Sequence, residues 1–188
     1  AMAETALWAV LALHRGFFTY ASSQAAVRWE PREQERAAEW PVLVLGQGEM
    51  GSAVTAVLRA QGYPVTGWRR SDGEPVLHAA LSKARVLVNL LPLTSQTRGL
   101  IDARLLALLP RGACLVNLAR GAHVVEPELL AALDTGQVGH AVLDVFQTEP
   151  LPSDHRFWRH PRVTVLPHAA AMTDARSAVI ELAGADNP

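Results

Sequence analysis

Short apolar segments alternating with helical stretches after Pro41 constrain the fold of this chain more than any other feature. The apolar segments are 42–45, 64–68, 85–91, 113–118, 139–146 and 162–167, and the expected helices include 50–61, 102–109, 126–135 and 172–183. Near-continuous apolar strands separated by helices are typical of a parallel sheet covered on both faces. Because crossover connections are right-handed, we expect an α/β fold with a doubly wound parallel sheet.

The first 41 residues follow a different pattern. Residues 3–27 carry apolar side chains at helical spacing, and we expect one helix there, buried in its own core or against another subunit. Residues 28–39 hold seven charges in twelve positions, which predicts a solvated connector. The chain therefore divides into a helix at 1–27, a charged connector at 28–41 and an α/β domain at 42–188.

Composition excludes several classes of protein. The net charge of −1, from 17 Lys and Arg against 18 Asp and Glu, gives no sign of a basic nucleic-acid-binding surface. The apolar run at 6–13 is too short to cross a bilayer, and Glu4 precedes it where a signal peptide has Lys or Arg. A single cysteine, Cys114, cannot form an internal disulfide or a Cys-rich zinc site. We expect a cytoplasmic protein with no nucleic-acid, membrane or metal partner.

A glycine motif follows the first apolar segment. Gly46, Gly48 and Gly51 form G-x-G-x-x-G, with Glu49 and Met50 between the last two glycines. The motif lies between a predicted strand and a predicted helix, where Gly46 makes a tight turn and Gly48 lets the backbone approach a pyrophosphate. Gly51 lets the helix pack closely on the strand. This context favours dinucleotide binding over an ordinary turn and makes residues 42–188 a dinucleotide-binding, Rossmann-like domain.

The end of the second segment indicates which dinucleotide. An NAD site needs an acidic residue there for the ribose 2′-hydroxyl, whereas this chain has Trp68, Arg69, Arg70 and Ser71. Guanidinium groups bind a 2′-phosphate, and the alternative is two solvated surface arginines. We therefore predict NADP, with NADPH favoured over NADH.

Polar residues follow the later strands, at the sheet edge where ligands bind in such folds. They are Arg120, Asp144, Glu149 and His168. A histidine supported by a carboxylate can donate a proton to a carbonyl oxygen as hydride adds to the carbon, and an arginine can bind a substrate carboxylate. Each alone has a simpler explanation, as a surface charge, a turn residue or a loop histidine. Together they suggest carbonyl reduction.

Five stretches carry a resemblance to a known family. They are VLGQGEMGSAV, VNLLPLTSQTRGLI, GACLVNLARGAHVVEPELLAAL, AVLDVFQTEPLP and HPRVTVLPHAAA. The chain resembles the cofactor-binding domain of the D-isomer-specific 2-hydroxyacid dehydrogenases, most closely the glyoxylate/hydroxypyruvate reductase A type.

The resemblance implies roles for individual residues. It implies that Arg120 binds the substrate, that His168 donates the proton and that Glu149 assists His168. It implies that Asp144 holds the nicotinamide carboxamide. It also places further residues at the cofactor, namely Leu91, Pro92 and Thr97 on the adenosine and phosphate side, together with Leu118, Ala119 and Ala170.

The family also implies an activity and a missing part. Its members have a second domain that closes over the substrate, and this chain begins near the first helix of the cofactor domain, so we expect a fragment that binds cofactor but barely reduces a small 2-oxoacid. A non-catalytic nicotinamide-sensing module, such as a corepressor, is the alternative. An S-adenosylmethionine-dependent methyltransferase leaves Arg120, Glu149 and His168 unexplained. Formate dehydrogenases of the same fold have Gln where this chain has Glu149.

The first helix also predicts a partner. Its apolar side chains are too many for one exposed helix of a monomer, and it resembles the family's dimerisation helix. The residues concerned are Leu7, Trp8, Val10, Leu11, Leu13, Phe17 and Phe18. We expect a homodimer through residues 5–18.

Overall fold

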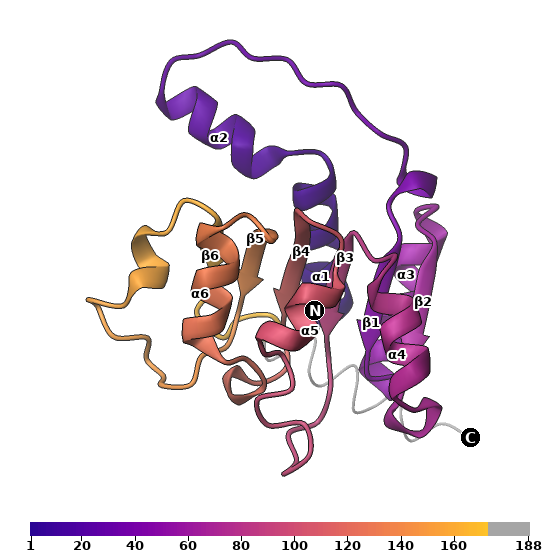
Figure 1. The fold of residues 1–188 in the computed structure, drawn as a ribbon. Coiled ribbons are helices and arrows are strands. Elements are labelled where there is room, and N and C mark those ends of the chain that lie inside the picture. The colour runs from indigo at the N-terminus through magenta and orange to yellow at the C-terminus, as the bar shows by residue number, and fades with distance from the viewer. Residues whose placement is uncertain (173–188) are drawn as a thin grey trace.

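A six-stranded parallel sheet lies at the centre of the computed structural model, which describes residues 1–172 (Figure 1). Its strands are β1 (Val42–Leu45), β2 (Val65–Trp68), β3 (Val86–Asn89), β4 (Ala113–Asn117), β5 (Val138–Leu143) and β6 (Val163–Val165). They pair in the order β2-β1-β3-β4-β5-β6, and every pairing is parallel. The predicted doubly wound α/β fold is confirmed.

Helices cover both faces of this sheet (Figure 1). The helices α4 (Glu74–Leu81), α5 (Ala103–Leu108) and α6 (Glu126–Asp134) bury leucines in one core cluster. The helices α1 (Met2–His14) and α3 (Glu49–Ala60) form a second cluster on the opposite face.

The central strands are apolar throughout because successive side chains point to opposite faces. In β1, Leu43 and Leu45 enter the first cluster, whereas Val42 and Val44 enter the second. All four are at most 1% exposed. Alternating side chains therefore serve two cores, which explains runs such as VLVL.

The predicted helix at 3–27 is wrong as a single element. Helix α1 ends at His14 and α2 spans Phe17–Ala25, with Gly16 between them at φ +69°. This left-handed conformation favours glycine and ends the first helix. Helix α4 was not predicted, because it is short and follows directly on the turn at 70–73. Of the helix expected at 172–183, residues 173–183 lie outside the described residues.

Helix α1 packs into the core of its own chain. Ala6, Ala9 and Val10 are fully buried, and the small alanines allow α1 to lie close against the sheet and α3. Trp8 remains 42% exposed and Phe17 56% exposed. The apolar character of the predicted dimerisation helix is therefore explained in part by packing within the chain.

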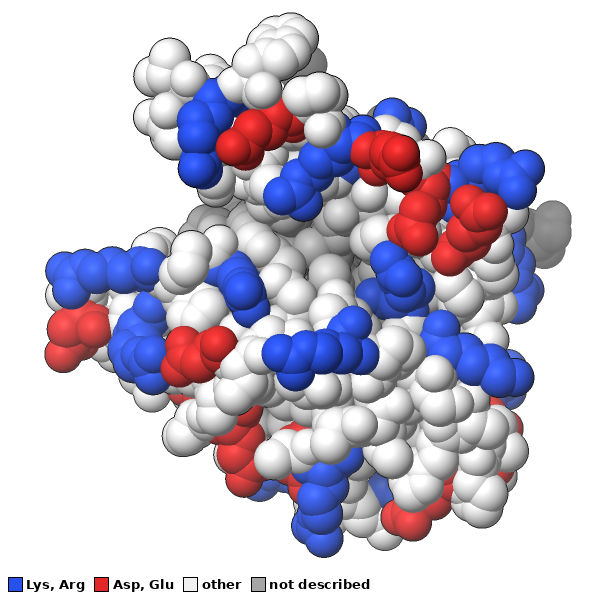
Figure 2. Space-filling view, turned by 45° about the horizontal axis from the view of Figure 1, so that its top comes forward, with Lys and Arg blue, Asp and Glu red and all other residues white. Residues whose placement is uncertain are grey.

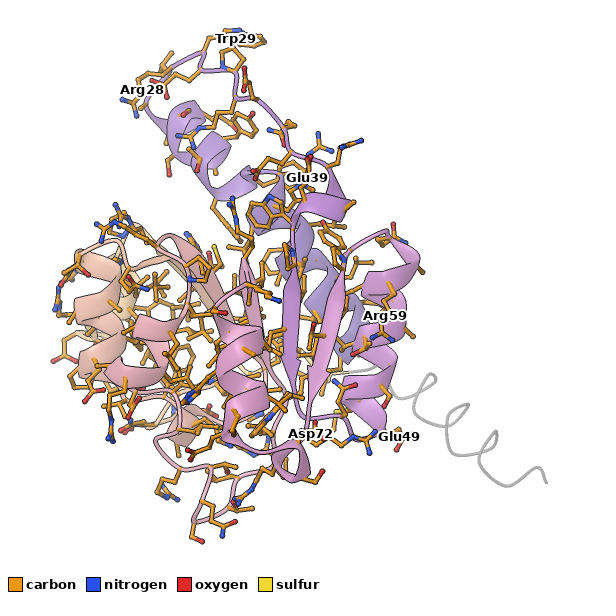
Figure 3. The ribbon with its side chains drawn as sticks, turned by 45° about the vertical axis from the view of Figure 1, so that its right-hand side comes forward. Arg28, Trp29, Glu39, Glu49, Arg59 and Asp72 are labelled. Atoms are coloured by element: carbon orange, nitrogen blue, oxygen red, sulfur yellow. The ribbon has the colours of Figure 1, made fainter. Side chains whose placement is uncertain are left out.

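Helix α2 and the segment after it form an arm that projects from the sheet (Figure 1). Trp29 lies at the far end of this arm and is 95% exposed (Figure 3). The arm returns to the body at the short helix η1 (Ala37–Glu39), where the Glu35 carboxylate pairs with Arg85 at 3.0 Å. The predicted charged connector is thus exposed over residues 28–36 and anchored at its end, where Trp40 is buried.

Both signs of charge occur on the face seen in Figure 2, where Lys and Arg predominate across the middle and several Asp and Glu side chains gather at the upper right. Within residues 1–172, none of the helices has the length and apolarity needed to cross a membrane.

Candidate cofactor and active site

The carboxyl ends of the parallel strands meet at one edge of the sheet. Strand β1 lies between β2 and β3, so the connections from β1 and β3 leave in opposite directions at this edge. Ligands bind at such a switch point in open α/β sheets.

The three glycines of the motif differ in what surrounds them. Gly46 has φ +93°, and a Cβ there would lie 2.7 Å from the carbonyl oxygen of Leu90, in the loop after β3. A Cβ on Gly51 would overlap the carbonyl of Gly46. Gly48 has an ordinary φ of −73°, and a Cβ there would meet nothing within 4 Å. Gly46 and Gly51 are therefore needed by the fold, whereas the space at Gly48 is open to a ligand.

Helix α3 begins at Glu49, immediately after this open space. Gly48 is its N-cap and no side chain caps the helix, so the N–H groups of the first turn remain available to an anion. Met50 is 57% exposed at the same turn. This combination of open space and free N–H groups fits the pyrophosphate of a dinucleotide.

Gln47 supports the glycine loop, a role that the sequence did not reveal. Its side-chain amide donates to the carbonyl of Gly46 at 3.2 Å and lies 3.3 Å from the hydroxyl of Thr55 in α3. A Cβ on Gly67 of β2 would overlap this amide. A glycine inside a strand marks a close approach, and that signal at Gly67 was available in the sequence.

The turn after β2 holds the two predicted 2′-phosphate ligands at the surface. Trp68 is buried, and its Nε1 donates to the carbonyl of Gly73 at 3.1 Å, which closes the turn. Arg69 and Arg70 are exposed, as is Ser71. The carboxylate of Asp72, labelled in Figure 3, accepts the N–H of Arg69 at 2.8 Å. Trp68 therefore shapes the turn, and a direct contact between its ring and a cofactor stays a prediction.

The turn after β3 is held by its own polar groups. The N–H of Leu91 donates to the Asn89 side chain at 3.2 Å, and the Thr97 hydroxyl donates to the carbonyl of Pro92 at 2.8 Å. Beside this turn, a cavity of about 570 Å³ extends between α4 and α5 and is lined in part by Trp68, Arg70 and Thr97. The geometry is consistent with the predicted adenosine side, and the contacts with cofactor stay predictions.

His168 and Glu149 form a bonded pair. The Nδ1 atom of His168 lies 2.7 Å from Oε2 of Glu149, whose other oxygen accepts the N–H of Phe146 at 2.9 Å. The His168 side chain is 51% exposed and has φ +56°, which turns it out of the line of β6. With Nδ1 bonded to the carboxylate, Nε2 is left for a substrate.

The surroundings of Glu149 keep it charged. Partial burial alone would raise the pKa of its carboxyl group, but the hydrogen bonds from His168 and Phe146 and the positive charges of His168 and Arg120 outweigh burial and lower it. A carboxylate is therefore present beside His168 at neutral pH, as a histidine-assisting acid requires.

Asp144 follows β5 rather than lying in it, and it holds the loop that carries His168. Its side chain is 1% exposed and accepts the N–H groups of Ala169 at 2.7 Å and Ala170 at 3.1 Å. Its backbone carbonyl accepts the N–H of His168 at 2.9 Å. Both carboxylate oxygens thus already accept backbone N–H groups. The predicted bond from Asp144 to a nicotinamide carboxamide stays a prediction.

Arg120 follows β4 and is exposed at the same edge. Its Nη1 donates to the carbonyl of Ala119 at 2.6 Å. The side chains of Leu118, Ala119 and Ala170 are buried, so they shape the floor of the site rather than project from it. Arg120, Glu149 and His168 are thus gathered on one rim, as the order of the strands predicted.

A buried polar group beneath this rim was not predicted as part of the site. Asn89 and Asn117 are the last residues of the neighbouring strands β3 and β4, and both are fully buried together with His123. Asn89 Nδ2 donates to Oδ1 of Asn117 and to Nδ1 of His123, each at 3.0 Å. An asparagine ending an apolar strand was the available signal. Among residues 1–172, no cluster of three or more His, Cys, Asp or Glu side chains could hold a metal ion.

Comparison with known proteins identifies the family. The sequence profile described as "D-isomer specific 2-hydroxyacid dehydrogenase, NAD binding domain" matches residues 7–170. The chain belongs to this family. It comprises the NAD(P)-binding domain of a D-isomer specific 2-hydroxyacid dehydrogenase, and the resemblance stated from its motifs is confirmed.

Three relatives of this dehydrogenase domain illustrate the match. Glyoxylate/hydroxypyruvate reductase A of Salmonella paratyphi B is 44% identical over 95% of this chain and 60% of its own length. A D-isomer specific 2-hydroxyacid dehydrogenase from Xanthobacter autotrophicus, solved with NADPH and MES, is 39% identical with a TM-score of 0.91 over 97% of this chain and 61% of that one.

The third relative matches at nearly equal length. It is the apo form of an NADPH-dependent glyoxylate/hydroxypyruvate reductase from Sinorhizobium meliloti, 36% identical with a TM-score of 0.88 over 94% of this chain and 95% of that one. The dehydrogenase domain described here spans about 60% of the length of the curated relatives that it matches.

Proposed function

We propose that this chain is the cofactor-binding part of an NADP(H)-dependent reductase that converts a small 2-oxoacid, such as glyoxylate or hydroxypyruvate, to the 2-hydroxy acid. The observation that carries the proposal is the bonded pair of His168 and Glu149 at 2.7 Å, on the same rim as Arg120. The names of the Salmonella and Sinorhizobium relatives support this substrate class.

Each residue of this rim has a step to perform. The reduced nicotinamide, when bound, supplies a hydride to the carbonyl carbon of the substrate. The Nε2–H of the His168 imidazolium donates its proton to the carbonyl oxygen, which leaves a neutral ring and a hydroxyl group. Glu149 keeps Nδ1–H bonded throughout, so the ring stays oriented. The Arg120 guanidinium binds the substrate carboxylate.

The preference for NADP rests on the turn after β2. Arg69 and Arg70 are exposed there, and neither of them forms an ion pair within residues 1–172. Asp72 follows them, but its carboxylate is turned back onto the N–H of Arg69. The NADPH complex of the Xanthobacter relative supports the same cofactor.

The test is a pair of calorimetric titrations of the chain with NADPH and with NADH. Each charge-assisted bond to the 2′-phosphate contributes about 1.5–3 kcal/mol, so we expect NADPH to bind at least about tenfold more tightly. Arg69→Asp should remove or reverse this preference. Arg159→Asp is the control, because it makes the same charge change at an exposed arginine of the remote helix η4 (Arg156–Arg159). Equal affinities in the unmutated chain would contradict the preference.

A homodimer is the proposed assembly. Trp8 and Phe17, the most exposed of the seven apolar residues named for residues 5–18, support it. Val10 and Leu13 are buried in the chain's own core, which reduces the surface left for a partner. The cytoplasmic location also stays a prediction, and it rests on the single cysteine.

A further inference from the structure

His123 lies beneath the rim that carries Arg120, and it is fully buried. It ends the short helix η3 (Gly121–His123), directly after the arginine. The proposed mechanism gives this histidine no step, and its ring is nevertheless bonded at both nitrogens. Nδ1 lies 3.0 Å from Nδ2 of Asn89, and Nε2 lies 3.3 Å from the carbonyl oxygen of Pro92.

These partners determine where the ring carries its hydrogen. The Asn89 side-chain oxygen accepts the N–H of Leu91, so the amide nitrogen must be the group that faces His123. That nitrogen donates, and Nδ1 therefore accepts. The Pro92 carbonyl can only accept, so Nε2 carries the hydrogen. Burial, reinforced by the charges of Arg120 and Arg98, lowers the pKa of His123 against the effect of its carbonyl partners, which agrees with a neutral ring.

One side of this group holds the backbone of Arg120. The Arg120 carbonyl accepts from Nδ2 of Asn117 and from the N–H of His123, both at 3.2 Å. Asn117 is in turn bonded to Asn89. The loop has little freedom beyond these bonds, because Gly121 lies so close to the backbone of Phe146 that a Cβ would overlap it.

The other side holds the turn after β3. The Pro92 carbonyl that accepts from His123 also accepts from the Thr97 hydroxyl. The same imidazole ring is therefore bonded to the turn predicted to line the cofactor and, through Asn89 and Asn117, to the loop of the predicted substrate arginine.

We propose that His123 is a positioning residue that couples these two loops, so that binding of the nicotinamide dinucleotide at the turn after β3 orders Arg120 to receive the substrate carboxylate. This inference rests on the proposed function. A histidine that merely fills the core would stabilise the fold without linking cofactor binding to the order of Arg120.

Two substitutions test the two hydrogen bonds of the His123 ring separately. In His123→Asn, the shorter amide can reach the position of Nδ1 and keep the bond to Asn89, but it cannot reach Pro92. In His123→Gln, the longer amide can reach the position of Nε2 and keep the bond to Pro92. His140→Gln is the matched control, since His140 is a largely buried histidine of β5 whose bond, to Thr164, touches neither loop.

The measurements are NADPH affinity by calorimetry and the order of the Arg120 side chain by the ¹⁵N NOE of its Nε–H group. In the unmutated chain, NADPH should raise this NOE. In His123→Asn we expect about tenfold weaker NADPH binding and no rise, because the turn after β3 loses its hydrogen bond to the ring. In His123→Gln we expect an NADPH affinity closer to that of the unmutated chain. The NOE of Arg120 should stay low both before and after NADPH is added. His140→Gln should behave as the unmutated chain in both measurements.

The proposal is overturned if both His123 variants retain the NADPH affinity and the NOE response of the unmutated chain. Ring ¹⁵N shifts of the unmutated chain provide a test that needs no variant: an Nδ1–H tautomer or an imidazolium at pH 7 would also overturn it. If the unmutated chain binds neither NADPH nor NADH, the proposed function fails instead. In that case the coupling to cofactor fails with it, and the ring tautomer and the NOE of Arg120 in the two variants without cofactor test only whether His123 holds the Arg120 loop.

Discussion

The glycine loop provides the sharpest separation between binding and folding in this chain. Its three glycines have the same chemistry, yet the structure surrounds each of them differently. We consider alanine at each position in turn, because the added methyl group is the same in all three variants.

Gly48→Ala should impair binding and leave the fold intact. The backbone there has φ −73°, which alanine adopts freely, and its Cβ would meet no protein atom within 4 Å. Such a change raises the free energy of unfolding by up to about 1 kcal/mol, because the unfolded chain loses entropy. The methyl group occupies the space where the pyrophosphate must approach, so we expect NADPH affinity to fall at least about tenfold, or about 1.4 kcal/mol.

Gly46→Ala and Gly51→Ala should impair the fold. At Gly46 the backbone has φ +93° and the Cβ would lie 2.7 Å from the Leu90 carbonyl, so strain alone costs about 1–3 kcal/mol. At Gly51 the Cβ would overlap the Gly46 carbonyl, and helix α3 must move away from β1, at about 1–3 kcal/mol or more. Urea unfolding measures stability, and calorimetry with NADPH measures binding. If Gly48→Ala binds NADPH as tightly as the unmutated chain, no phosphate approaches this loop and the assigned role is refuted.

Two further predictions concern stability and assembly. Burial, with smaller effects of nearby positive charges, lowers the pKa of His140 from 6.5 to about 4, so protonation favours the unfolded chain. The contribution of His140 to the free energy of unfolding should not change above pH 6.5, and the free energy should fall by about 3 kcal/mol as the pH decreases to 4. Urea unfolding at several pH values should show that this decrease is absent in His140→Gln. An equal pH dependence in the variant would contradict the prediction. Sedimentation at micromolar concentration should show a dimer that Trp8→Ser with Phe17→Ser converts to monomer, and a monomeric unmutated chain would contradict the interface.

The strands could be predicted from the sequence because each central strand serves two cores. Their apolar runs leave no ambiguity about burial, and the observed bounds fall within the predicted segments except at Val138, where β5 begins one residue earlier. The N-terminal helix could not be predicted correctly, because the apolar pattern continues past Gly16. Only the backbone shows that this glycine adopts φ +69° and ends α1.

The positions of Arg120, Glu149 and His168 on one rim followed from the order of strands and loops. Their hydrogen bonds did not, because a sequence shows which residues end a strand but not which backbone N–H groups they meet. Asp144 illustrates this difference. Its place after an apolar strand was visible, whereas its two bonds to the loop of His168 depend on the path of the chain after β6.

Three neighbouring strands end in the same way, and this common arrangement explains how the rim is kept rigid. Strand β3 ends at Asn89, β4 ends at Asn117, and Asp144 directly follows β5. All three side chains are at most 1% exposed. Each accepts backbone N–H groups of the loop that follows its own strand or the next one: Leu91 for Asn89, Ala119 for Asn117, and Ala169 and Ala170 for Asp144.

A buried polar group without partners costs about 1–3 kcal/mol, so a loop that moved away would leave its asparagine or aspartate unsatisfied. The two core clusters determine where the strands lie, and these three side chains determine where the loops go. Each of these loops carries a residue proposed to bind or react, and the exposed side chains of Arg120 and His168 therefore extend from a backbone that is itself held in one place.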